Sequence, residues 1–121
     1  IGIGTGVPAA RVDLEGTLGL EATTTTVSST AATTVDSLPI ATYRSSRFQV
    51  QITQGTDYQS ADLMVIHDGT TATLIEYGSI ATANMLATFT STISGSNLVL
   101  QVNMGSSSSA TVKVVRYGIS I

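Results

Sequence analysis

The strongest constraint on the fold of this chain is an alternation of apolar and polar residues that recurs along most of its length. Phe48, Val50 and Ile52 are separated by single polar residues, and side chains two positions apart lie on the same face of a strand. The same spacing recurs over residues 87–93, 98–104 and 112–117. No comparable stretch repeats with the period of a helix. The pattern predicts an all-β protein.

Turn signals separate these expected strands. Asp68 and Gly69 lie between two apolar runs, and this dipeptide favours a hairpin with a type I′ turn, in which both central residues have positive φ. A second hairpin is expected at residues 94–97, and the chain turns again at residues 55–58. About six or seven short strands joined in this way are typical of an antiparallel β-sandwich or jelly-roll-like domain.

Ser and Thr supply most of the polar surface. The chain contains 35 of these residues, whereas only 11% of it is charged. Thr suits a half-exposed strand, while Glu and Lys, which are common on helix surfaces, are rare here. The tract at residues 23–36 is either a disordered linker or edge-strand structure, and we expect strands because it lacks the Pro, Glu, Lys and Gly typical of disorder. The composition of residues 80–86 does not decide whether a helical turn forms there.

Residues 1–22 differ from the rest because five glycines and Pro8 interrupt short apolar pairs. Such a segment forms short strand pieces separated by turns. Its apolar side chains are too few for a core of their own. Either the following domain or, as we favour for a glycine-rich stalk, the same segment of sibling chains around a threefold axis would bury them. We therefore divide the chain into a stalk or oligomerisation segment, residues 1–22, and an antiparallel β-sandwich domain, residues 23–121. The candidate trimer-interface residues are Ile3, Val7, Val12, Leu14, Leu18 and Leu20.

Several classes of function are disfavoured. The chain has no cysteine, so disulfides and thiolate chemistry are excluded. Its net charge is −3 and its five Lys and Arg residues are scattered, so no nucleic-acid partner is expected. The longest apolar run, residues 63–66, is far shorter than the roughly 20 residues of a spanning helix, and we expect no membrane insertion.

Few residues suggest chemistry. His67 and Asp68, together with a serine, are the residue types of a hydrolytic triad. However, neighbours on a strand point to opposite faces, and no Gly-x-Ser-x-Gly sequence presents a nucleophilic serine. The carboxylates lie beside expected turns, and we favour solubilising and turn-forming roles for them over those of a glycosidase acid and base. One histidine without cysteine provides no zinc set, and Pro8 stands where a dinucleotide-binding motif would begin a helix. We expect no catalytic residue, no metal site and no cofactor.

A ligand would meet the loops first. The candidate ligand-facing residues are Asp57, Tyr58, His67 and Asp68, together with the loop at residues 105–109. A carbohydrate-binding function predicts a pocket that holds a tyrosine beside a carboxylate. The tyrosines either line a sugar-binding face or lie at the edge of the core, and the second interpretation is favoured. These four residues are Tyr43, Tyr58, Tyr77 and Tyr117.

Two stretches resemble known phage proteins. The opening IGIGTGVPAARVDLEGTL resembles the G-I-G-T-x-x-P-x-x-x-L-x-V-x-G motif of tail-fibre and other trimeric surface proteins of phages, although Val-Asp-Leu stands here where Leu-Asp-Val is commoner. About residues 38–119, including the ending VKVVRYGI, are similar to a domain of structural proteins of cyanophages and other marine myovirus-like phages. The residues that match the first motif are Ile3, Gly4, Thr5, Pro8, Val12, Leu14 and Gly16.

The resemblance implies a structural component of a tailed-phage virion and not an enzyme. Such a fibre or surface protein would lie on the outside of the particle, form a homotrimer, contact other virion proteins and take part in host attachment through a surface glycan. The alternatives are a carbohydrate-binding adhesin module and a self-assembling filament subunit, in which Thr-rich strand edges at residues 23–35 pair between chains.

Overall fold

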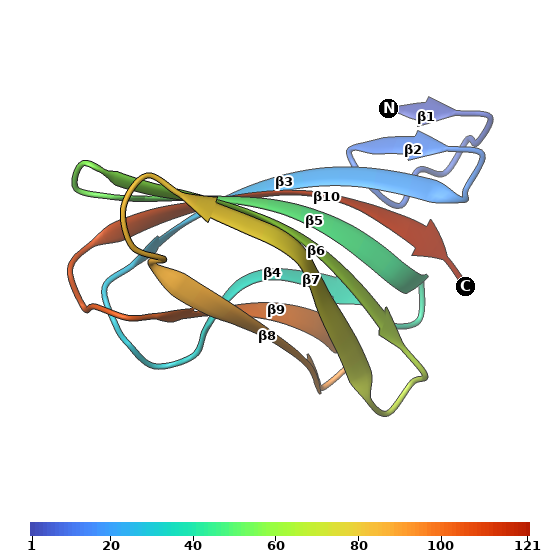
Figure 1. The fold of residues 1–121 in the computed structure, drawn as a ribbon. Coiled ribbons are helices and arrows are strands. Elements are labelled where there is room, and N and C mark those ends of the chain that lie inside the picture. The colour runs from blue at the N-terminus through green and yellow to red at the C-terminus, as the bar shows by residue number, and fades with distance from the viewer.

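The protein is a two-layered β-sandwich (Figure 1), described for residues 1–121 by a computed structural model. Ten strands make up the fold, and no helix long and apolar enough to cross a membrane is present. The strands are β1 (Gly2–Ile3), β2 (Val12–Leu14), β3 (Leu18–Val27), β4 (Thr33–Pro39), β5 (Tyr43–Gln54), β6 (Asp57–His67), β7 (Ala72–Ala81), β8 (Ala87–Ser94), β9 (Asn97–Met104) and β10 (Ala110–Ser120).

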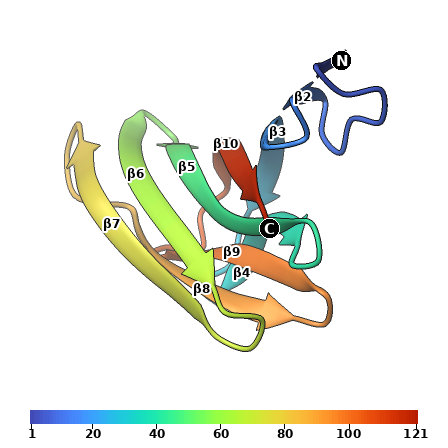
Figure 2. The same ribbon diagram turned by 90° about the vertical axis from the view of Figure 1, so that its right-hand side faces the viewer.

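The two layers differ in size. The larger sheet has the strand order β1-β2-β3-β10-β5-β6-β7, and the smaller sheet has the order β4-β9-β8. All neighbouring strands are antiparallel except β1 and β2. The larger sheet curves around the smaller one, and its opposite face carries no further layer (Figure 2). The expected all-β sandwich is therefore confirmed, with one face of its larger sheet open.

One core fills the space between the sheets. It contains 19 buried apolar residues. Phe48, Val50 and Ile52 of β5 are fully buried, as their alternation with polar residues predicts. From the smaller sheet, Leu98 and Leu100 of β9 face them. Because β5 lies inside the larger sheet and β9 is the central strand of the smaller one, this contact joins the middles of both layers.

Both expected hairpins form, but the turn at Asp68 is not of type I′. Only Gly69 has positive φ, at 93°, and the connection runs over residues 68–71. The Asp68 carboxylate accepts hydrogen bonds from the backbone N–H groups of Thr70 and Thr71 at 2.9 and 2.8 Å. This side-chain capping stabilises a longer loop than the dipeptide alone suggests. The second hairpin turns tightly through Gly95, whose φ is 61°.

The Thr-rich tract is ordered. It supplies part of β3 and the first half of β4, as expected. Beyond its short pairing with β2, the outer edge of β3 has no strand partner. Residues 82–86, which join β7 to the smaller sheet, form no helical turn.

The N-terminal segment extends the larger sheet. β2 pairs with the start of β3, and β1 pairs with β2. The expected division after residue 22 falls inside β3. Asp13 organises the segment, because its carboxylate accepts hydrogen bonds from the N–H groups of Ala9 at 2.8 Å and Gly16 at 3.0 Å. Residues 18–22 are therefore part of the sandwich sheet.

A pair of glycines anchors this extension. Gly19 of β3 and Gly118 of β10 are register partners, and the ring of Tyr43 lies against both. A Cβ added at Gly118 would lie 2.7 Å from Tyr43 Cδ1, and one at Gly19 would collide with the Tyr43 hydroxyl. Glycine is required at both positions because only a surface without side chains admits the ring.

Candidate functional site

The open face of the larger sheet carries an unusual number of large apolar side chains. Strand register places Leu18 beside Ile119, and Leu20 beside Tyr117. Further along the same face, Met64 pairs with Ile75. We call the following group the apolar outer face: Ile3, Val12, Leu14, Leu18, Leu20, Met64, Ile66, Ile75, Tyr77, Val115, Tyr117 and Ile119. Side chains of this kind on a single uncovered sheet face mark an interaction surface.

An ion pair lies at the centre of this face. The Arg47 guanidinium donates two hydrogen bonds to Asp62, with Nη2 at 2.6 Å from Oδ2 and Nε at 3.1 Å from Oδ1. The Tyr77 ring lies 5.3 Å from the guanidinium carbon, in cation–π contact. Arg47 lowers the pKa of Asp62, and Asp62 raises the pKa of Arg47. Both charges are thus satisfied within the face.

Beside this centre the face becomes polar. Gln49 donates to Ser60 at 2.9 Å, and a hollow of about 260 Å³ contains these two residues with Asp62 and Tyr77. A second hollow of about 380 Å³ holds Tyr58 and again Ser60. In the first hollow Tyr77 lies beside Asp62, away from the loops where the sequence led us to expect a tyrosine beside a carboxylate.

The expected ligand-facing residues do not converge. Asp57 and Tyr58 begin β6, whereas His67 ends it, so the two pairs lie about 30 Å apart at opposite ends of one strand. The loop at residues 105–109 lies at the Asp57 end, since Gln54 bonds the backbone of Ser108 at 2.8 Å. The four residues cannot contact one small ligand together.

His67 is engaged in structure. It is 4% exposed, its Nδ1 accepts the Gly69 N–H at 2.9 Å, and its Nε2 lies 2.6 Å from the Tyr43 carbonyl oxygen. Because Nδ1 accepts, the proton belongs on Nε2, which donates to that carbonyl. Nδ1 therefore holds the β6–β7 loop, and Nε2 ties the end of β6 to the start of β5. Asp68, the next residue, caps the same loop.

The candidate trimer-interface residues mostly do converge. Five of the six lie on the apolar outer face, where Ile3 pairs with Leu14, Leu14 with Leu18 and Val12 with Leu20. The sixth, Val7, lies in the loop between β1 and β2 and is 86% exposed. The segment thus carries its apolar side chains onto the surface formed by Tyr117 and its neighbours.

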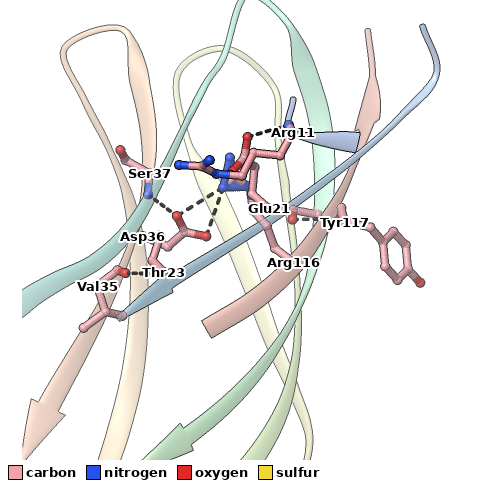
Figure 3. Close-up of polar contacts among 9 residues, drawn as sticks. Arg11, Glu21, Thr23, Val35, Asp36, Ser37, Arg116 and Tyr117 are labelled. Carbon is pink, nitrogen blue, oxygen red and sulfur yellow. Dashed lines mark hydrogen bonds and ion pairs between the residues drawn. The ribbon is translucent and has the colours of Figure 1, made fainter. Parts of the chain in front are cut away.

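A second polar group lies on the inner face of the same sheet (Figure 3). Arg116 Nη1 lies 3.1 Å from both carboxylate oxygens of Asp36, and Asp36 Oδ1 also accepts the Ser37 N–H at 2.9 Å. The side chains are 9% and 3% exposed. Burial raises the pKa of Asp36, and Arg116 opposes that shift. Arg116 and Tyr117 point to opposite faces of β10, as Figure 3 shows.

The ion pair borders a polar hollow between β3 and β4. The hollow measures about 480 Å³ and includes Glu21 as its second carboxylate. Glu21 is itself paired with Arg11, at 3.3 Å. The sequence singled out neither carboxylate, although Arg116 shares the inward parity of Val112 and Val114. No group of three or more His, Asp or Glu side chains is placed to hold a metal ion.

Two solved structures with a similar fold are phage tailspikes. The tailspike of Acinetobacter baumannii phage AM24 matches with a TM-score of 0.59 and 8% identity, over 88% of this chain and 27% of that one. The tailspike of Acinetobacter phage vB_ApiP_P1 matches with a TM-score of 0.52 and 19% identity, over 85% of this chain and 22% of that one. The chain therefore spans about a quarter of each tailspike, and at these identities the likeness shows a shared fold. No protein-family model and no curated protein matches the sequence.

Proposed function

We propose that this chain is a structural β-domain of a phage tail protein, a fibre or tailspike, displayed on the surface of the virion. The observation that carries the proposal is the fold shared with two phage tailspikes over more than four fifths of the chain. The tail-fibre-like motif at the N-terminus supports it independently. A hydroxyl-rich sandwich without cysteine suits a particle exposed to variable redox conditions.

The domain acts as a homotrimer that supports host attachment. Residues 1–22 contribute Ile3, Leu14 and Leu18 to an apolar surface that a single chain leaves partly exposed. Assembly around a threefold axis would bury such a surface.

The domain is not an enzyme. The carboxylates of the inner hollow, Asp36 and Glu21, are each held in an ion pair, whereas glycoside hydrolysis needs one free carboxylate and one protonated carboxylic acid. Incubation with host polysaccharide, followed by an assay for new reducing ends, checks this directly. Release of sugar that Glu21→Gln abolishes would contradict it.

Electron microscopy of labelled particles tests the proposal as a whole. Gold-labelled antibodies raised against the chain should bind the tails of intact virions from the source of this sequence. Heads or free cellular protein labelled in place of tails would overturn the assignment. An antibody against an unrelated protein serves as the control.

Glycan binding is a second candidate function. The observation in its favour is the hollow in which Tyr77 lies beside Asp62, with Gln49 and Ser60 as hydrogen-bonding groups. Aromatic rings pack on the apolar faces of sugars while such groups fix orientation. A glycan array should detect binding that Tyr77→Ala removes, with Tyr43→Phe as the buried control. Binding unchanged in Tyr77→Ala would exclude this hollow.

A further inference from the structure

We propose that a second copy of this chain packs on the apolar outer face, so that the larger sheet itself, together with its β1–β2 extension, forms the trimer interface. Such an interface presupposes the trimeric assembly proposed above and specifies which surface joins the copies. The N-terminal segment then acts as one edge of a wide sheet contact and not as a separate stalk.

The first support is the area available. Seven residues of the apolar outer face are between 38% and 58% exposed: Ile3, Ile66, Ile75, Tyr77, Val115, Tyr117 and Ile119. If each has roughly 150–250 Å² of surface, they offer on the order of 700 Å². A standard protein interface buries about 800 Å² on each partner. The half-buried members of the face supply the remainder, so the surface is of the size that a stable contact needs.

The second support is the pairing of the charges at the centre of the apolar outer face. At the centre of the face the oppositely charged Arg47 and Asp62 already bond each other, so covering them leaves neither charge unpaired. Lys113, which lies on the same side of β10, is two residues beyond Val115 toward the polar region. Arg, Tyr and Met are enriched at the cores of interfaces, whereas Lys, Glu and Asp are depleted there. Asp62 is the exception on this face, and its charge is balanced by Arg47. Arg47 against the Tyr77 ring is therefore suited to burial by a protein partner.

The third support is continuity with the N-terminal segment. One row of register partners runs from Ile3 through Leu14 and Leu18 to Ile119. The row continues on β6 with Ile66, which is 52% exposed. The residues expected from the sequence to join sibling chains thus form one surface with strands more than 40 residues further along the chain. A second copy is the occupant that this continuity favours.

A glycan fits this surface less well. Oligosaccharides need hydrogen-bonding groups as well as aromatic rings, and the row that ends in Ile119 and Ile66 offers aliphatic side chains. The groups suited to sugar, Gln49 and Ser60, lie together at the neighbouring polar region. Because the glycan hollow shares Asp62 and Tyr77 with the apolar outer face, a second copy packed on this face would cover the hollow, and the two functions compete for one place.

Light scattering of the full chain provides the test. We expect the wild type to have three times the chain mass, and Val115→Lys and Ile66→Lys to fall to the mass of one chain. Each should raise the dissociation constant by about 100-fold or more, because an unpaired ammonium would be buried at the contact. Thr88→Lys is the matched control, since Thr88 is exposed on the smaller sheet. It should remain a trimer.

Val115→Thr is a milder variant for the case that a lysine variant does not fold, because it keeps the β-branched shape. It should still weaken assembly by about tenfold. Circular dichroism should be unchanged in all these variants. If all the outer-face variants remain trimers, the proposed interface is wrong, whereas the proposed trimeric state is retained. A wild type that stays a monomer at every concentration, or a face that binds glycan as a monomer, would also overturn it, while the labelling of virions tests the phage assignment separately.

Discussion

The two faces of the larger sheet are built from the same strands and the same alternation, yet they differ in what covers them. Val114 is 1% exposed and its neighbour Val115 is 56% exposed. Each face also carries one Arg–Asp pair, Arg116 with Asp36 inside and Arg47 with Asp62 outside. The inner face is completed by the smaller sheet, whereas the outer face has an interior-like composition without a layer above it. Apolar residues on a strand therefore identify a contact surface, but not whether the contact lies within one chain.

The largest difference in the free energy of unfolding between the two faces should come from their ion pairs. Asp36→Ala leaves the Arg116 charge buried without a partner, and this should lower the free energy of unfolding by about 3–5 kcal/mol. In the dissociated chain, Asp62→Ala removes an exposed partner and should cost only a small fraction of that. Denaturant unfolding of both variants measures the contrast.

A double variant sharpens the result. Asp36→Leu with Arg116→Met removes both charges and should recover most of the lost stability, because apolar residues of similar size often replace a buried pair without loss. Equal costs for Asp36→Ala and Asp62→Ala would mean that the inner pair is hydrated like the outer one.

Neighbouring valines of β10 test packing on the two faces. Val114→Ala opens a cavity in the core and should cost roughly 2 kcal/mol. Val115→Ala should change the stability of the dissociated chain by less than about 0.5 kcal/mol. Thermal unfolding at low protein concentration measures both. A large cost at Val115 in the dissociated chain would show that the outer face is packed within one chain after all.

Two glycines extend the comparison to backbone positions. Gly118→Ala places a Cβ 2.7 Å from Tyr43 Cδ1 on the inner face and should cost about 1–3 kcal/mol through overpacking. Gly78 lies on the outer face with no atom within 4 Å of an added Cβ, so Gly78→Ala should be close to neutral. Tyr43→Leu should rescue part of the Gly118→Ala loss. A neutral Gly118→Ala would show that the ring can move aside.

Strand positions and the burial of their side chains could be predicted from the periodicity of the sequence. Features that depend on specific side-chain contacts could not. Alternation predicted the burial of Phe48 and its neighbours, and it even placed Arg116 on the inward side. Pairing of Arg116 with Asp36 was not predictable, because it joins positions 80 residues apart on different sheets. The turn type at Asp68 was wrong since its carboxylate caps two backbone groups. Residues 1–22 supplied five predicted members of the apolar outer face, whereas its part on β6 and β7 was missed, because Met64 and Ile66 belong to a run that is apolar on both sides of the strand.

The smallest effect concerns the protonation of the two paired aspartates. Burial raises the pKa of Asp36, with Arg116 opposing, while Arg47 lowers the pKa of Asp62. In a carbon-detected NMR titration, the Asp36 midpoint should lie above the ordinary value of about 3.9 and the Asp62 midpoint below it. Because the folded pKa of Asp62 is lowered, its stabilising contribution is present above the unfolded pKa and is lost as pH falls through the folded value. For Asp36 the raised pKa reverses the sign, so its contribution is lost as pH rises through the folded value.

Partner substitutions separate the causes of these two shifts. Arg47→Met should return the Asp62 pKa toward its ordinary value, because the hydrogen bonds from Arg47 are its largest cause. Arg116→Met should raise the Asp36 pKa further, because burial remains and the compensating charge is gone. An Asp36 midpoint below that of Asp62 in the wild type would mean that the guanidinium outweighs burial on the inner face. In that case the two ion pairs would differ in exposure alone, and the electrostatic contrast between the faces would fail while the packing contrast at Val114 and Val115 could still hold.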